Sequence, residues 1–368
     1  MPLVLLVVRR RATGGFQNAS GMSGGAPVHP PHDRATRSLS DTQATPSYPP
    51  DPSRRYPASV YTEHLHIPVG VGTLHVERRG RGGPAVVLLH GFATCAFLWR
   101  DVAPRLAAAG LTTVAIDLLG HGESDRPADA LYGASAQADY VDRALTALRL
   151  GEVTVVTQDA GALVGALLAS HRPTRVRSLA LVEPLDPEEL PGPMIRAMQR
   201  SSALSALSAN ALFGARPLLE PWLLERLGDA AEPDRLVARY LAPFVGSAGA
   251  AELLQLASHV MLSDTERRRL ADVAVDTHLW LGRGDPLEAS AVVISETLRP
   301  ATLPHSIGTR GLFDRWSALL PASSVQARVA TTPPGALVAE VSASALADVI
   351  REIVEPGIPS GSAPANES

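Results

Sequence analysis

The sequence predicts an α/β fold in which a mostly parallel, eight-stranded sheet carries helices on both faces. Apolar runs rich in β-branched residues alternate with helical segments between residues 84 and 183. Strand-like patterns stop between about 184 and 271 and then resume. A β-branched run ends at Asp159, and an Ala-rich helical segment follows at once. Apolar strands interleaved with helices are typical of parallel sheets, which bind ligands at the carboxyl ends of their strands.

The segments up to residue 183 predict a hairpin followed by alternating strands and helices. Alternating polar and apolar residues at 62–69 and 72–79 are typical of two paired strands. Further strands are expected at 84–90, 111–117, 152–158 and 176–183, with helices at 98–109, 135–150 and 160–171. This order implies a sheet that is covered on both faces.

The later segments predict a helical lid and the remainder of the sheet. Helical pieces at 194–206, 217–227 and 235–241 would form a lid over the turn at Asp159. Strands are expected at 276–282 and 325–331, and a closing helix at 344–354. The interval 288–321 is long and has no clear assignment.

The predicted organisation is one domain at 59–355, with the lid at 184–271, between two disordered segments. Residues 1–58 are rich in Gly, Ser, Pro and Thr, and 356–368 have the same character. Such segments cannot bury enough apolar surface to offset the entropy of ordering. The apolar run at 3–8 is shorter than the ~20 residues of a membrane span. We therefore expect no membrane anchor, and Met22 is an alternative start.

Charge and cysteine content exclude several functional classes. The formal net charge of −4 provides no basic surface for nucleic acid. The single cysteine, Cys95, excludes an internal disulfide and a multi-cysteine metal site. A cytoplasmic location is therefore expected. No pair of histidines has convincing metal-ligand spacing, so neither a metal nor another cofactor is expected. The oligomeric state does not follow from the sequence.

Asp159 is the principal candidate catalytic residue. It occupies the centre of a pentapeptide with small residues on both sides, between a strand and a helix. Such an elbow presents a nucleophile above the sheet, which favours a carboxylate that attacks carbon. The alternative is that Asp159 only caps the helix by accepting hydrogen bonds from its first amides.

Three stretches resemble the α/β-hydrolase superfamily. They are 88–100, which includes His90-Gly91-Phe92-Ala93-Thr94 and Leu98-Trp99-Arg100; 117–125, Asp-Leu-Leu-Gly-His-Gly-Glu-Ser-Asp; and the Asp159 elbow. Within the superfamily they are similar to the haloalkane dehalogenase and epoxide hydrolase branch. The resemblance implies an Asp nucleophile, an alkyl-ester intermediate, and a small apolar substrate such as an epoxide, haloalkane or ester.

The resemblance also implies roles for several other residues. The backbone amides of Phe92 and Ala160 would form the oxyanion hole. The acid of the catalytic triad would be Asp285, after the strand at 276–282, or Glu183, which some dehalogenases use instead. Trp99 and Tyr240 would contact substrate. Ala160 itself departs from the dehalogenase pattern, which has Trp after the nucleophile.

The expected catalytic histidine is missing. The segment 335–340 places Ala336 where the branch carries His, and alanine cannot accept a proton. His305 is the only histidine whose chain position permits it to act instead; a solvated loop histidine is the alternative reading. The sequence therefore leaves two hypotheses open: a hydrolase with an incomplete triad, or a non-hydrolytic, ligand-binding homologue.

Overall fold

A mixed sheet forms the centre of the protein in the computed structural model, which describes residues 62–191, 193–200, 214–228, 230–245, 248–281, 294–295, 309–329 and 338–355. Within these ranges the strands pair in the order β1-β2-β4-β3-β5-β6-β7-β9-β8. Their bounds are β1 Glu63–Pro68, β2 Thr73–Arg79, β3 Ala85–Leu89, β4 Thr112–Ile116, β5 Val153–Gln158, β6 Val176–Val182, β7 Asp276–Leu281, β8 Ile294–Ser295 and β9 Val325–Val329. Strands β4 to β9 in this order are parallel. The hairpin β1–β2 and the edge strand β8 pair antiparallel.

The predicted fold class is confirmed. The eight predicted strands correspond to β1–β7 and β9, and the two-residue β8 adds a ninth at one edge of the described sheet. The central strands β4 and β5 are buried along their whole length. This burial explains why they appear in the sequence as continuous apolar and β-branched runs rather than as alternating patterns.

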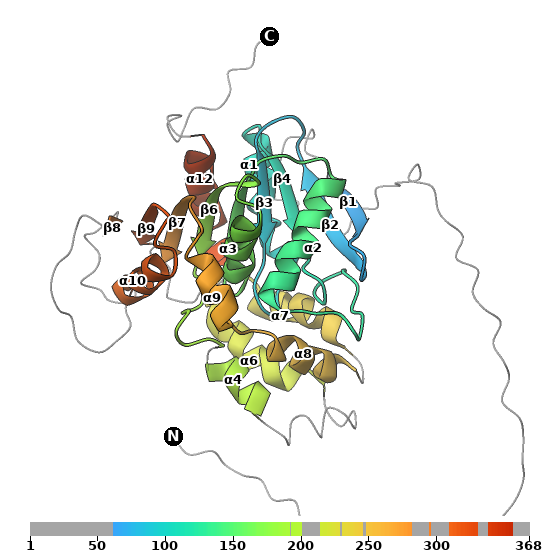
Figure 1. Cartoon of the computed structure of the whole chain (residues 1–368). Coiled ribbons are helices and arrows are strands. Elements are labelled where there is room, and N and C mark those ends of the chain that lie inside the picture. Colours follow the sequence, from blue (N-terminus) through green and yellow to red (C-terminus); the bar gives the residue numbers. More distant parts are fainter. Residues whose placement is uncertain are drawn as a thin grey trace, which may run out of the picture. The chain divides into compact units, whose positions relative to one another are not determined.

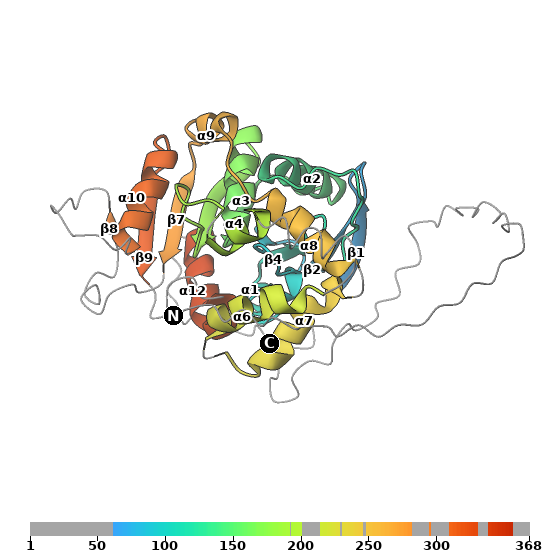
Figure 2. The ribbon, with the colours of Figure 1, turned by 90° about the horizontal axis from the view of Figure 1, so that it is seen from below.

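Helices cover both faces of the sheet (Figures 1 and 2). Helices α2 (Ala134–Ala147) and α3 (Gly161–His171) lie together on one face. Helices α1 (Ala103–Ala108) and α12 (Ala343–Val354) lie together on the other. Helix α3 is buried from Gly161 to Ala169, because it packs on the sheet and on its neighbours at the same time.

The helix predicted at 98–109 is wrong in its extent. The structure has a 3-10 helix η1 (Ala96–Trp99) and then a separate helix α1. Pro104 lies in the first turn of α1. Proline has no amide hydrogen to donate and is tolerated at the start of a helix but not inside one, so the chain starts a new helix here.

A helix also occupies part of the interval that had no assignment. Helix α10 (Thr309–Leu319) buries Phe313 and Trp316. The Trp316 indole donates a hydrogen bond to the Leu185 carbonyl over 3.1 Å. The sequence did carry a signal for this helix, because Phe313, Trp316, Leu319 and Leu320 recur at helical spacing and are all buried.

Several helices are inserted between β6 and β7, and we call them the inserted helices. They are α4 Pro193–Arg200, α6 Arg216–Leu227, α7 Pro233–Leu241, η2 Ala242–Phe244, α8 Gly249–Ser258 and α9 Asp264–Leu270. Helices α4, α6, α7 and α8 gather at one end of the sheet (Figure 1). The sequence predicted α6 and α7 but not α8 or α9. The lid boundaries 184–271 and the domain limits 59–355 stay predictions, and the segments 1–58 and 356–368 lie outside the described residues.

Across the described ranges, every helix falls short of the length or apolar character that a membrane span requires.

The elbow at Asp159 depends on glycines that admit close backbone contacts. A Cβ on Gly161 would lie 2.4 Å from the His90 carbonyl oxygen, so a side chain there would collide with the loop after β3. A Cβ on Gly165, one turn later, would lie 2.6 Å from Thr157 Cγ2. Helix α3 therefore lies directly against β3 and β5, which holds the elbow and the loop after β3 together.

We predict that Gly161→Ala lowers the free energy of unfolding by about 2–3 kcal/mol, because the new methyl group meets fixed backbone. Gly151→Ala is the matched control, since a Cβ at Gly151 would contact nothing within 4 Å. This control is expected to change stability by less than about 0.5 kcal/mol. Urea denaturation measures both, and equal stabilities of the two variants would contradict the packing argument.

Candidate active site

Asp159 lies at the tip of the elbow between β5 and α3. Its backbone has a φ of +57°, in the left-handed region that most residues avoid. Its side chain is only 2% exposed. Helix α3 has Ala160 as its N-cap residue and no side-chain cap, so the Asp159 carboxylate does not act as the helix cap. The elbow instead turns this carboxylate towards the loop after β3.

The loop after β3 supplies a hydrogen bond to the carboxylate. The Phe92 amide donates to Asp159 Oδ2 over 3.3 Å. Gly91 permits this approach, since a Cβ there would lie 2.5 Å from the Asp159 Cβ. The Phe92 amide, expected in an oxyanion hole, thus contacts the candidate nucleophile itself. The role of the Ala160 amide stays a prediction.

His90 holds this loop in place. Its Nδ1 donates to the Gly91 carbonyl over 2.7 Å, and its Nε2 accepts from the Leu118 amide over 3.0 Å. Burial lowers the pKa of His90, which favours the neutral ring that this pair of contacts requires. With both ring nitrogens engaged, His90 positions Phe92 rather than carrying protons.

An arginine from the inserted helices approaches the same carboxylate. Arg226, near the end of α6, places its Nη2 3.3 Å from Asp159 Oδ1. Its guanidinium also lies over the Trp222 ring, 4.8 Å from the centroid. Trp222 in turn contacts the Phe92 ring edge-on at 6.1 Å between centroids. Helix α6 therefore covers the elbow with a cation and an aromatic ring.

Sequence reasoning missed Arg226. It lies on a helix that contains three other charged residues, Arg216, Glu220 and Glu225, and nothing in its spacing distinguishes it. Its burial offers the signal that the sequence lacks: the side chain is 11% exposed, which is low for an arginine on a helix near the surface.

The candidate triad is only partly within the described residues. Glu183 follows β6, is 5% exposed and has a φ of +43°. Its neighbour Val182 accepts a hydrogen bond from the Asp159 amide over 3.1 Å, so the two acids stand at adjacent strand ends. Asp285, His305 and Ala336 lie outside the described residues. The choice between Asp285 and Glu183 stays a prediction.

The two expected substrate contacts are both deeply buried. Trp99 is fully buried in η1. The Tyr240 hydroxyl on α7 donates to Glu340 Oε1, and Glu340 also forms a bidentate ion pair with Arg100 at 2.6 and 2.5 Å. Burial raises the pKa of Tyr240 well above its usual value, so the phenol keeps its proton. Tyr240 thus ties α7 to the C-terminal segment, and its contact with substrate stays a prediction.

A small cavity, partly open to solvent, lies beside the elbow. Its wall combines residues that flank Asp159 with residues of α2, α3 and α8, among them Phe92, Ala160, Gly161, His121, Leu256 and His259. Apolar side chains form most of this wall. The cavity therefore suits a small, largely apolar ligand.

His121 is a buried polar residue in this cavity wall. Its Nδ1 lies 3.4 Å from the Leu119 carbonyl, and its Nε2 has no hydrogen-bond partner within the described ranges. Burial lowers the pKa of His121 to about 3, so the ring is neutral at physiological pH. With the proton on Nδ1, the Nε2 lone pair is an acceptor. Sequence reasoning assigned His121 only to a structural motif.

Comparisons with known proteins agree with this fold. The alpha/beta hydrolase fold family matches residues 84–207. A haloalkane dehalogenase of Agrobacterium fabrum is 43% identical over 112 residues, which are 30% of this chain and 36% of that protein. One of Mesorhizobium japonicum is 36% identical over 133 residues, 36% of this chain and 42% of that protein. The chain thus matches about two-fifths of the length of these curated relatives.

Solved structures extend the likeness to most of the chain at the level of fold. Haloalkane dehalogenase DbeA from Bradyrhizobium elkani has a TM-score of 0.61 and 20% identity, over 80% of this chain and 98% of that one. The epoxide hydrolase CorEH has a TM-score of 0.58 and 19% identity, over 79% of this chain and 98% of that one. The protein has the α/β-hydrolase fold, and over part of its length it is similar to haloalkane dehalogenases.

Proposed function

We propose that the protein is a hydrolase that uses Asp159 as a nucleophile on a small apolar electrophile, such as an epoxide, a haloalkane or an ester-like compound. One observation carries this proposal: a carboxylate held 2% exposed at the tip of a left-handed elbow, with a backbone amide 3.3 Å from one oxygen. A residue other than glycine with its backbone in the left-handed region costs free energy, and such residues cluster at functional sites. The resemblance to dehalogenases supports the same reaction class.

In the first step, an Asp159 carboxylate oxygen forms a bond to the electrophilic carbon. In a haloalkane the carbon–halogen bond breaks and the halide departs with the bonding electron pair; in an epoxide the carbon–oxygen bond breaks and the oxygen stays on the substrate as an alkoxide, which takes a proton from water. The product is an alkyl ester of Asp159. In the second step water attacks the ester carbonyl, and the Phe92 amide, joined by that of Ala160, stabilises the negative charge on its oxygen. The bond between the ester carbonyl carbon and the alkoxy oxygen breaks, the alcohol leaves with one proton of the water, the carboxylate is restored and the second proton passes to solvent.

Arg226 opposes the first step while it remains beside Asp159. Attack on carbon consumes the negative charge of the carboxylate, and a cation 3.3 Å away stabilises that charge before reaction. A neutral electrophile therefore reacts best when Arg226 has moved away. Since Arg226 and Trp222 both lie on α6, displacement of this helix would expose the elbow, and α6 would act as part of a lid.

The second step lacks the base that the resemblance implies. Glu183 stands at the strand end next to Asp159. One carboxylate cannot both replace the missing histidine as the base and orient a histidine that acts as the base. Without positioned proton transfer, ester hydrolysis loses about 10²–10⁴-fold in rate. The alkyl ester would then accumulate.

A second candidate function is the binding of a small apolar molecule without turnover. The cavity beside the elbow favours it, because an unpartnered acceptor, His121 Nε2, lies in a wall of apolar side chains. A ligand with one hydroxyl or N–H group would satisfy that acceptor. Tight, saturable binding of such a molecule, with no labelling of Asp159 by any electrophile, would support this function over the first.

We predict that alkyl halides and epoxides add one alkyl group to the protein, seen as an intact-mass increase, and that Asp159→Asn abolishes the addition. The amide is a far weaker nucleophile than the carboxylate, whereas its size is nearly unchanged. Peptide mapping should place the group on Asp159. Labelling of the variant at the rate of the wild-type protein would exclude Asp159 as the nucleophile.

We predict that Ala336→His clears this adduct and restores turnover. A histidine at that position would activate water, which accelerates hydrolysis of the ester by about 10²–10⁴-fold. Mass spectra taken after removal of excess electrophile measure the loss. Ala339→His, three residues along, is the matched control. An adduct that is equally long-lived in all three proteins would refute the proposed defect.

We predict that Arg226→Leu accelerates labelling by a neutral alkyl electrophile about tenfold, because the carboxylate loses its counter-charge. Arg216→Leu, on the same helix but paired with Glu220 at the surface, is the control and should leave the rate unchanged. The measurement is the rate of the intact-mass increase. Slower labelling of Arg226→Leu than of the control would mean that Arg226 assists the reaction.

A further inference from the structure

One face of the β1–β2 hairpin gathers four residues that bind metals in other proteins. The antiparallel register places His64 opposite Glu77 and His66 opposite His75. Residues two apart in a strand share a face, and directly opposed residues lie on the same side of the sheet. All four side chains therefore leave the same face of the hairpin.

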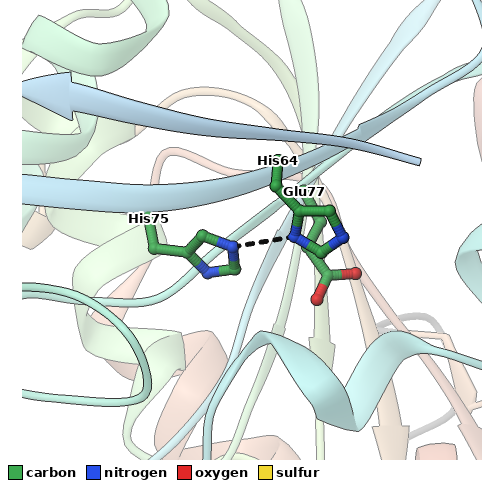
Figure 3. Close-up of side chains that lie close together, drawn as sticks. All are labelled: His64, His75 and Glu77. Carbon is green, nitrogen blue, oxygen red and sulfur yellow. Dashed lines mark hydrogen bonds between the residues drawn. The ribbon is translucent and has the colours of Figure 1, made fainter. Parts of the chain in front are cut away.

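Three of these side chains converge. The ligand atoms of His64, His75 and Glu77 all lie within 4.8 Å of one another. Figure 3 shows the two imidazoles side by side with the carboxylate beneath them, and His64 Nδ1 is 3.0 Å from His75 Nε2. Donors around a tetrahedral zinc ion with 2.0–2.1 Å bonds are about 3.4 Å apart. Small side-chain rotations would bring these donors to one ion.

A buried carboxylate orients the central histidine. His75 Nδ1 lies 2.8 Å from Asp117 Oδ2, and both side chains are almost inaccessible to solvent. Asp117 is itself held by the amides of Ala96 at 2.5 Å and Glu123 at 2.9 Å. The Nδ1 proton of His75 therefore points at Asp117, and its Nε2 presents a lone pair towards His64. A carboxylate behind a histidine is the usual outer shell of a metal ligand.

We propose that this hairpin binds one divalent transition-metal ion, with zinc as the best fit, through His64 Nδ1, His75 Nε2 and a Glu77 carboxylate oxygen. Two imidazoles and one carboxylate suit zinc, and water completes a four-coordinate shell. Glu123, whose Oε2 is 3.8 Å from His75 Nε2, adds negative charge beside the ion. The site is independent of the hydrolase reaction.

The contacts within the cluster also describe its metal-free state. There, His64 Nδ1–H donates to His75 Nε2, and Arg79 lies 3.7 Å from Glu77 Oε2. Metal binding moves the His64 proton to Nε2 and replaces the bond between the rings with two bonds to the ion. If the two histidines only formed a hydrogen bond with each other, no carboxylate would be needed beside them. The convergence of Glu77, together with the oriented His75, favours a metal.

The metal would fasten β1, an edge strand, to β2. The ion joins a residue of β1 to two of β2, so it binds the folded hairpin and not the unfolded chain. By linkage, such binding raises the stability of the protein as the zinc concentration exceeds the dissociation constant. Thermal unfolding therefore gives a readout that does not depend on enzymatic activity.

The test titrates chelator-stripped full-length protein with zinc chloride by calorimetry, and with cobalt chloride by visible absorption. We expect one ion per chain, tetrahedral cobalt bands, and a higher midpoint of thermal unfolding with zinc. His64→Ala and Glu77→Gln should each weaken binding by at least about 100-fold, more than the loss of an outer-shell group costs. His278→Gln, a half-buried histidine on β7, is the control and should bind as the wild type does.

Circular dichroism and metal-free unfolding establish that each variant is folded. Glu77→Gln keeps the size of the side chain at a half-buried position, so it carries the test if His64→Ala fails to fold. The absence of stoichiometric binding, or wild-type affinity in a folded Glu77→Gln protein, would overturn the proposal. Equal weakening in His278→Gln would show nonspecific binding to histidines and would overturn it too.

Discussion

The buried carboxylate of Asp117, at the carboxyl end of β4, holds three segments of the chain together. It accepts hydrogen bonds from the amides of Ala96 and Glu123 and from the His75 ring. Although burial raises the pKa of Asp117, the hydrogen bonds from the His75 ring and the Ala96 amide lower it by more, so the carboxylate stays ionised. Gly122 permits this arrangement, because a Cβ there would lie 2.2 Å from Asp117 Cγ. The loop after β3 and the face of the β1–β2 hairpin that carries His75 both depend on the Asp117 carboxylate.

The same region shows how the fold places the candidate nucleophile. The Leu118 amide, next to Asp117, donates to His90, and His90 orients the loop that presents the Phe92 amide to Asp159. Each step is a hydrogen bond between buried groups, which is costly to break. The elbow is therefore rigid on the side of the sheet. On the other side it meets α6, whose Arg226 lies 3.3 Å from the carboxylate.

The sheet and elbow could be predicted because they leave local patterns: β-branched runs in β4 and β5, and glycines around Asp159. Arg226 could not, because its importance arises only when α6 folds back onto β5. The histidine cluster was missed for a similar reason. His64, His75 and Glu77 have no metal-binding spacing along the chain, and only the register of the hairpin brings them together. The triad stays a prediction: Asp159 and Glu183 are at adjacent strand ends, and Asp285, His305 and Ala336 lie outside the described residues.

The Glu340 carboxylate contacts two segments that are distant in the sequence. It pairs with Arg100 in the loop region after β3 and accepts a hydrogen bond from Tyr240 on α7, one of the inserted helices. Its side chain is fully buried, so it contributes only after the surrounding segments have assembled. During synthesis, residue 340 leaves the ribosome after all the inserted helices. Until then Arg100 lacks its counter-ion and α7 lacks its anchor. The Tyr240 anchor of α7 can therefore form only after residue 340 has been made, later than any contact within the inserted helices themselves.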